Sequence, residues 1–194
     1  MKKIIVVLCS ILMLISISTP IPTYAKDFND LNIQMNNISP YIEEYIVYDK
    51  GEKHIITINR ETYALTIDDE IFMPTIEEIP ITRTSVDYST GANLKYEIPW
   101  RAASVMIASL IAVVPGLKYQ VASAIISAVV SEGSPIFVTY TQYRSKESYY
   151  STYHGMSYKK CICKNIRAYE NSISSKNLIY GPVDGGWFDP IRPS

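Results

Sequence analysis

Residues 100–131, WRAASVMIASLIAVVPGLKYQVASAIISAVVS, form an apolar stretch in the middle of the chain. Pro115 and Gly116 interrupt it, because proline cannot continue a helix and glycine suits the turn that follows one. The segments on both sides of this break are rich in Ala, Ser, Val and Ile and are compatible with helices. The stretch therefore predicts an apolar helical hairpin over residues 100–132, with one helix on each side of the break.

Small side chains recur every four residues in both predicted helices. Ser104, Ala108 and Ala112 follow this spacing in the first helix, and Ala124 and Ala128 follow it in the second. Such rows let two helices approach closely, as they do in membranes. Each helix would be about 20 Å long, which is shorter than the roughly 30 Å hydrocarbon core of a bilayer. The hairpin is either buried in the protein or inserted in lipid, and we favour burial as the resting state.

Short strands separated by turn-forming residues are expected on both sides of the hairpin. Their ranges are 41–48, 54–59, 62–67 and 71–73 before it, and 136–143, 149–154 and 158–169 after it. Alternating apolar and polar residues between such turns are typical of antiparallel strands. The predicted fold class is α+β, with short antiparallel β meanders flanking a central apolar helical hairpin.

The charge of the chain is divided unevenly. The net charge is −1, but residues 26–99 carry 14 acidic and 6 basic side chains, whereas residues 100–194 carry 5 acidic and 10 basic ones. The two halves therefore either dock against each other or have separate roles. The small net charge gives no reason to expect a nucleic-acid partner. The expected regions are an acidic N-terminal β region at 26–83, a linker at 84–95 and a basic C-terminal region at 96–194, which includes a Tyr-rich β sheet at 136–169.

The first 25 residues have the pattern of a secretory signal peptide. Lys2 and Lys3 precede an apolar run at residues 4–17, and Thr23 and Ala25 place small residues before a cleavage site. We expect cleavage after Ala25 and a secreted, extracellular protein. An uncleaved N-terminal anchor is the alternative.

Tyrosines and lysines gather in the second half of the chain. Tyrosine and lysine together suit a membrane interface, a cell-wall glycan or a protein partner. The alternative interpretation is cross-strand pairing of aromatic rings on a half-exposed sheet. The expected surface-contact residues are Tyr149, Tyr150, Tyr153, Lys159, Lys160 and Lys164.

Cys161 and Cys163 would lie on the same face of a strand, near the upper limit of the distance that a disulfide spans. A strained local disulfide, an intermolecular disulfide and two free thiols all remain possible. His154 is the only histidine nearby, because His54 lies a hundred residues away, so we expect no metal site. No serine-based or carboxylate-based catalytic motif is present either, and we expect neither a catalytic residue nor a cofactor.

The Pro115-Gly116 break between apolar helices in a basic, exported segment resembles the hydrophobic hairpins of bacteriocin-like secreted proteins of Gram-positive bacteria. The resemblance implies a membrane-active antimicrobial that acts on a target-cell membrane or envelope and is restrained by its acidic N-terminal portion. The residues implied in membrane contact are Trp100, Ala108, Ala112, Pro115, Gly116, Ala124 and Ala128. The alternative is a secreted, non-enzymatic binding or inhibitor module with a protein partner, in which the hairpin is buried core.

Overall fold

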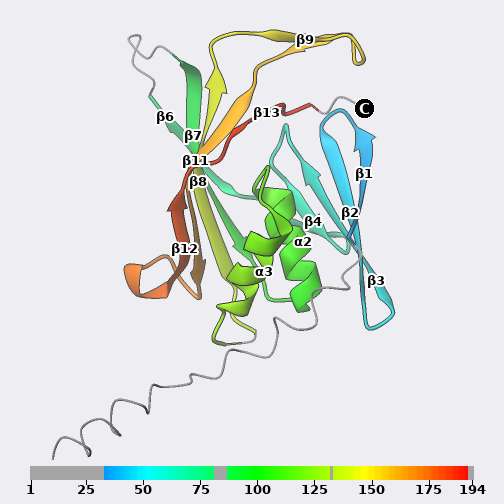
Figure 1. Ribbon diagram of the computed structural model, residues 1–194, viewed down its shortest axis with the longest axis vertical. Coiled ribbons are helices and arrows are strands. Elements are labelled where there is room, and N and C mark those ends of the chain that lie inside the picture. Colours follow the sequence, from blue (N-terminus) through cyan, green and yellow to red (C-terminus); the bar gives the residue numbers. More distant parts are fainter. Residues whose placement is uncertain (1–32, 81–86, 132, 192–194) are drawn as a thin grey trace, which may run out of the picture.

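A computed structural model describes residues 33–80, 87–131 and 133–191, so the expected signal peptide lies outside the described residues. Two antiparallel sheets face each other and two short helices lie between them (Figure 1). Strands hold 51% of the described residues. The smaller sheet comes from the acidic N-terminal region, whereas the larger sheet combines strands of that region with strands of the basic C-terminal region.

The smaller sheet has five strands that follow one another as a meander, in the order β1-β2-β3-β4-β5. They are β1 (Gln34–Ser39), β2 (Ile42–Asp49), β3 (Glu52–Asn59), β4 (Leu65–Ile67) and β5 (Glu70–Phe72). Lys50 and Gly51 have positive φ in the turn after β2, as do Asp68 and Asp69 in the turn after β4. Glycine and aspartate are turn residues that tolerate left-handed backbone, and Lys50 adopts it beside Gly51.

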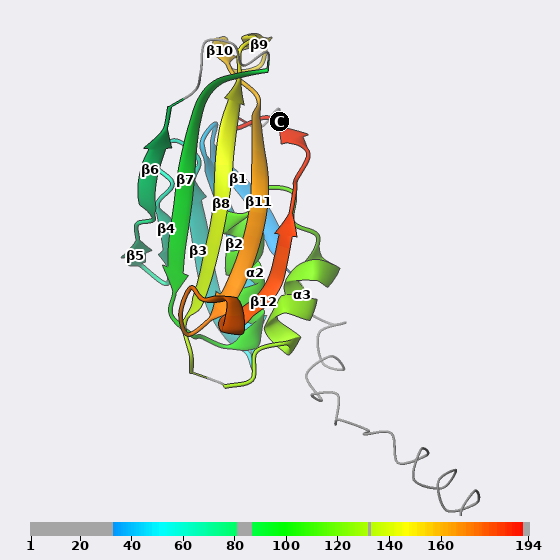
Figure 2. The same ribbon diagram turned by 90° about the vertical axis from the view of Figure 1, so that its left-hand side faces the viewer.

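The larger sheet has six strands, in the order β12-β11-β8-β7-β6, and β13 pairs with β11 on the same edge as β12. They are β6 (Thr75–Ile79), β7 (Tyr88–Ile98), β8 (Ile136–Ser145), β11 (Cys161–Glu170), β12 (Leu178–Val183) and β13 (Trp187–Phe188). A third, two-stranded sheet consists of β9 (Tyr149–Ser151) and β10 (Met156–Tyr158), and it lies beyond the upper end of β8 and β11 (Figure 2).

Helix α2 (Ala103–Val113) is enclosed by the two sheets. Nine of its eleven residues are buried, and it contacts β2, β3 and β4 on one side and β7 on the other. A helix that is apolar all round needs such enclosure in water. Helix α3 (Tyr119–Ser127) packs against α2, buries Ala122, Ile125 and Ile126, and turns its other face outward. Among the described residues, neither helix is long enough to cross a bilayer.

The expected α+β fold centred on an apolar helical hairpin is wrong, because the molecule is mostly β and its two helices are short. The break at Pro115 and Gly116 does end α2, and Gly116 has a φ of +78°. The expected linker at 84–95 largely belongs to β7, whose alternation points Leu94, Tyr96 and Ile98 inward. Sheets, rather than the hairpin, therefore organise the core.

Candidate functional site

Two grooves open at the end of the larger sheet where β8 leads into β9 and β10 returns to β11. Successive residues point to opposite faces of a strand, so Arg144 faces the space between the sheets while Ser145 faces outward. We call the groove between the sheets the inner cleft, which has a volume of about 620 Å³. The groove on the outer side, which we call the outer groove, has a volume of about 350 Å³.

Aromatic rings border the outer groove. Tyr88 on β7 stacks on Tyr143 of β8, with ring centroids 4.4 Å apart, and lies 6.0 Å from the ring of Trp187. Tyr143, Ile162 and Trp187 lie opposite one another on β8, β11 and β13. Trp187 lines the groove and is 46% exposed. Three strands thus place aromatic rings side by side on a surface that solvent reaches.

Charged groups of both signs line the outer groove. Its lysines are Lys146 and Lys160, and its carboxylates are Asp87 and Glu147. The Lys160 ammonium lies 4.7 Å from the ring centroid of Tyr149. The Tyr149 hydroxyl donates a 3.2 Å hydrogen bond to Glu147, which raises the pKa of that tyrosine. Because the opposite charges balance, the groove has no strong electrostatic field of one sign. It combines aromatic walls with many polar groups.

Tyr63, in the turn between β3 and β4, brings its hydroxyl to the inner cleft. That oxygen accepts hydrogen bonds from Gln142 Nε2 at 2.9 Å and from Arg144 Nη2 at 3.2 Å. Tyr63 has a φ of +62°, which is uncommon for a bulky residue. Its carbonyl accepts a 2.9 Å hydrogen bond from the hydroxyl of the buried Tyr96, which helps to hold this conformation. The two sheets therefore meet at the Tyr63 hydroxyl.

Arg144 and Lys159 bring positive charge to the inner cleft. Both side chains are half-buried, and among the described residues no carboxylate lies within ion-pair distance of either. Burial by itself lowers the pKa of Arg144, but the interactions with Tyr63, Cys161 and Tyr41 together outweigh it and leave the pKa raised. Arg144 therefore stays a cation in a partly dehydrated position.

The two cysteines lie in the core beneath the inner cleft as free, buried thiols. Cys163 lies opposite Gln142 on the neighbouring strand and donates a weak hydrogen bond to Gln142 Oε1 over 3.9 Å. Burial raises the pKa of Cys161 to about 11 and raises that of Cys163 further. Of the three states open from the sequence, the structure has two protonated thiols with little nucleophilic character.

The structure brings half of the expected surface-contact residues to these grooves. Tyr149 and Lys160 line the outer groove, and Lys159 lines the inner cleft. Lys164 instead pairs with Asp184 at 3.4 Å on the outer side of the sheet. The remaining two, Tyr150 and Tyr153, are exposed on and beside the β9–β10 ribbon and line neither groove.

The residues implied in membrane contact do not form one surface. Ala108 and Ala112 are fully buried in α2, whereas Ala124, Ala128 and Gly116 are exposed. The other two, Trp100 and Pro115, are half-buried. The row of small residues on α3 therefore faces solvent.

Several residues of the two grooves were missed from the sequence. Tyr63 lies in the predicted strand at 62–67, Arg144 lies in the turn expected after the strand at 136–143, and Trp187 lies in a Gly-rich tail. Their shared location depends on strand pairing between distant segments, which local sequence does not encode. The only local signal for the grooves was the alternation of residues along the strand at 136–143, which places Tyr143 and Gln142 on opposite faces of the sheet.

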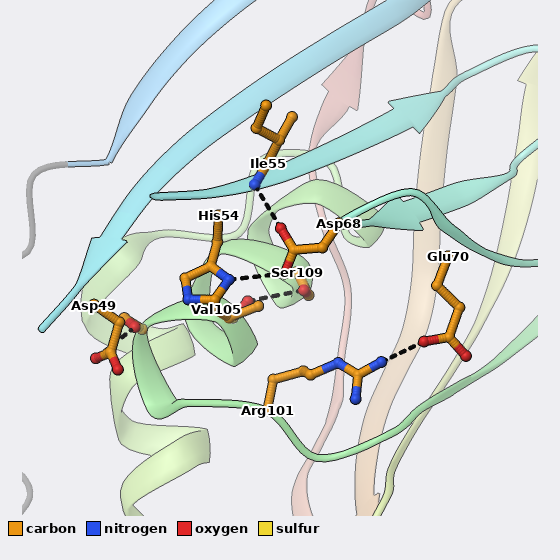
Figure 3. A network of polar contacts seen from close by, with 9 residues as sticks. Asp49, His54, Ile55, Asp68, Glu70, Arg101, Val105 and Ser109 are labelled. Atoms are coloured by element: carbon orange, nitrogen blue, oxygen red, sulfur yellow. Dashed lines mark hydrogen bonds and ion pairs between the residues drawn. The ribbon is translucent and has the colours of Figure 1, made fainter. Parts of the chain in front are cut away.

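A separate polar network lies where β3 and β4 pass the start of α2 (Figure 3). His54 Nδ1 lies 2.7 Å from Asp68, an arrangement that orients an imidazole as in catalytic triads. However, Ser104 donates to Asp49 and Ser109 donates to the Val105 carbonyl of its own helix, so neither hydroxyl is bonded to His54. Arg101 pairs with Glu70 nearby. In the part of the chain that the structure describes, no three His, Cys, Asp or Glu side chains gather as metal ligands.

Comparison of the chain with models of protein families, with curated proteins and with solved structures finds no match.

Proposed function

We propose that the protein is an exported, non-enzymatic binding module whose ligand contacts the outer groove. The observation that carries this proposal is the aromatic surface of Tyr88, Tyr143 and Trp187 beside a groove with balanced charges. Exposed Trp and Tyr are the residues that contribute most to binding surfaces, because they bury a large area with few rotatable bonds. The helices serve as core in this proposal.

The ligand class that fits this groove is a glycan of the cell envelope. Flat exposed rings stack against the C–H faces of sugar rings, and the groove offers both lysine donors and carboxylate acceptors to sugar hydroxyls. A polymer of neutral or weakly charged sugars needs no strong field of one sign, in agreement with the balance between Lys146, Lys160, Asp87 and Glu147.

A membrane-active antimicrobial, the function that the bacteriocin resemblance implies, would require a second conformation. The apolar residues of α2 lie between the sheets and offer no face to a bilayer in the folded state. The sheets would have to separate before this helix could meet lipid. We therefore propose the binding module as the function of the folded protein.

Co-sedimentation with purified, insoluble peptidoglycan tests the proposal. We expect the protein to sediment with it, and Trp187→Ala to weaken binding about tenfold through loss of the stacking face. Tyr150→Ala is the matched control, because Tyr150 is an even more exposed aromatic residue that lines neither groove. Circular dichroism checks that both variants fold.

Two results would contradict the proposal. One is a Trp187→Ala variant that binds peptidoglycan like the wild type. The other is dye release by the wild-type protein from anionic liposomes without any affinity for peptidoglycan, which would favour the membrane-active function.

A further inference from the structure

We infer that the inner cleft is a second binding site, which takes the carboxylate of a small organic ligand with Arg144 as its anchor. The cleft has a volume of about 620 Å³, which is large enough for a small molecule. It lies on the other face of the sheet from the outer groove, so this inference goes beyond the proposed function and does not depend on it.

The first argument is the unbalanced charge. Arg144 and Lys159 are half-buried cations that line one cleft, and no described carboxylate pairs with either. Partial burial removes water from a guanidinium, and an anion restores the lost interaction. Tyr63 is the only described side chain that bonds to Arg144, so most guanidinium N–H groups remain available to a ligand.

The second argument is the direction of the hydrogen bonds at Tyr63. Gln142 directs its oxygen to the Cys163 thiol and its nitrogen to Tyr63, so the tyrosine oxygen is an acceptor for both Gln142 and Arg144. Its own O–H proton has no acceptor among the described residues. This proton can therefore be donated to a carboxylate that Arg144 holds.

The third argument is the backbone of Tyr63. A φ of +62° is a strained conformation for a bulky residue, and such strain gathers at ligand sites. The hydrogen bond from the hydroxyl of Tyr96 to the carbonyl of Tyr63 holds this conformation from within the core. The Tyr63 hydroxyl is thus positioned before any ligand arrives, which lowers the entropic cost of binding.

The β6 side of the cleft selects a monoanion over phosphate. Glu78 on β6 contributes a negative charge, so with Arg144 and Lys159 the described lining residues have a net charge of +1. Ile76 and Ile79 add apolar surface beside it. The planar guanidinium suits the two oxygens of a carboxylate, while the isoleucines suit an aliphatic body. A phosphate dianion would face repulsion from Glu78.

Titration of the whole protein with hexanoate, followed by the side-chain NMR signal of Arg144, tests this inference. We expect saturable binding of hexanoate and none of hexanamide, which lacks the charge. Arg144→Met should weaken binding at least about tenfold, and Tyr63→Phe should weaken it about fivefold by removing one donor. For the variants, calorimetry replaces the Arg144 signal. Lys176→Met, which removes an exposed cation from the turn at Ser175–Asn177, should bind hexanoate like the wild type.

Equal binding of hexanoate by the wild type and Arg144→Met would overturn the inference, as would equal binding of hexanamide. Tighter binding of inorganic phosphate than of hexanoate would also overturn the assignment to a carboxylate. Peptidoglycan binding, measured on the same variants, should not change. Retained hexanoate binding without peptidoglycan binding would reject the proposed function alone.

Discussion

Arg60 holds Glu43 between the two sheets through two hydrogen bonds, from Nη2 to Oε2 at 2.7 Å and from Nε to Oε1 at 3.1 Å. Both side chains are only 7% exposed, and Tyr45 donates a further 2.7 Å hydrogen bond to Glu43. The Arg60 amide also donates to the Tyr41 carbonyl, so the pair joins the turn after β3 to the start of β2. Each carboxylate oxygen is thus bonded, which is the condition for a charge to be tolerated in the interior.

Glu43→Gln should therefore destabilise the fold strongly, because Arg60 would remain buried without an opposite charge. We expect a loss of about 3–5 kcal/mol in the free energy of unfolding, measured by urea denaturation. Glu44→Gln is the matched control, since Glu44 points to the other face of β2 and accepts a hydrogen bond from Asn36 that glutamine can also accept. It should cost less than about 1 kcal/mol. Similar losses in the two variants would contradict the assigned role of the pair.

Ala108→Asp and Ala124→Asp should have opposite outcomes. Ala108 has no exposed surface, so an aspartate there would be buried without a partner and cost more than about 4 kcal/mol, enough to prevent folding. Ala124 is exposed on α3, so the same change should leave a folded protein. Yield and circular dichroism measure the difference. A folded Ala108→Asp protein would show that α2 is not held between the sheets.

The cysteines should be unreactive in the native protein and should make it sensitive to alkali. The pKa of Cys161 is about 11, whereas an unfolded cysteine titrates at about 8.5. The fold favours the protonated thiol. Its contribution to the free energy of unfolding is therefore fully present below about pH 8.5 and is lost as the pH rises towards 11. Buried Tyr96 and Tyr140, whose pKa values are also raised by burial, act in the same direction.

Urea denaturation between pH 7 and pH 11 measures this loss, and Ellman's reagent at pH 8 measures thiol access. The double variant Cys161→Ala and Cys163→Ala should lose less stability with rising pH than the wild type. Rapid labelling of the native thiols at pH 8 would contradict this prediction, because it would show that the core around Cys161 and Cys163 opens readily.

Gly181→Ala should destabilise the edge of the larger sheet. A Cβ at this position would lie 2.1 Å from the carbonyl oxygen of Ile166, and the residue has a φ of +90°. Because backbone cannot move aside as a flexible side chain can, we expect a loss of about 2–4 kcal/mol in the free energy of unfolding. Gly186→Ala, where a Cβ meets nothing within 4 Å, is the control and should stay within about 1 kcal/mol of the wild type. Equal melting temperatures for the two variants would contradict this account.

Local signals in the sequence identified turns and several strands, but not the fold class. The turn at Gly51 and the break at Gly116 followed from glycine, which tolerates positive φ. The length of the apolar stretch favoured a fold centred on a helical hairpin, although its two helices have only eleven and nine residues. The polar residues around Gly91 suggested a linker and concealed β7, whose inward residues alternate regularly from Leu94.

The candidate site was less predictable than the strands. Tyr149, Lys159 and Lys160 were found because tyrosine and lysine cluster in the sequence there. Trp187 reaches the outer groove only because β13 pairs with β11, and Tyr63 reaches Arg144 only because the two sheets face each other. Such contacts depend on tertiary packing across long sequence separations, which periodicity in one segment does not contain.

The position of both helices between β7 and β8 in the chain also determines how the protein can fold. These neighbouring strands pair from Ile98 and Ile136 to Tyr88 and Ser145, and the chain between them contains α2 and α3. Closing this ladder requires a long loop to be ordered, which is slow, and it completes the enclosure of α2 on the side of the larger sheet. The folding chain therefore exposes an apolar helix until its central strands pair, and this interval is when the protein is most open to aggregation or to capture by a lipid surface.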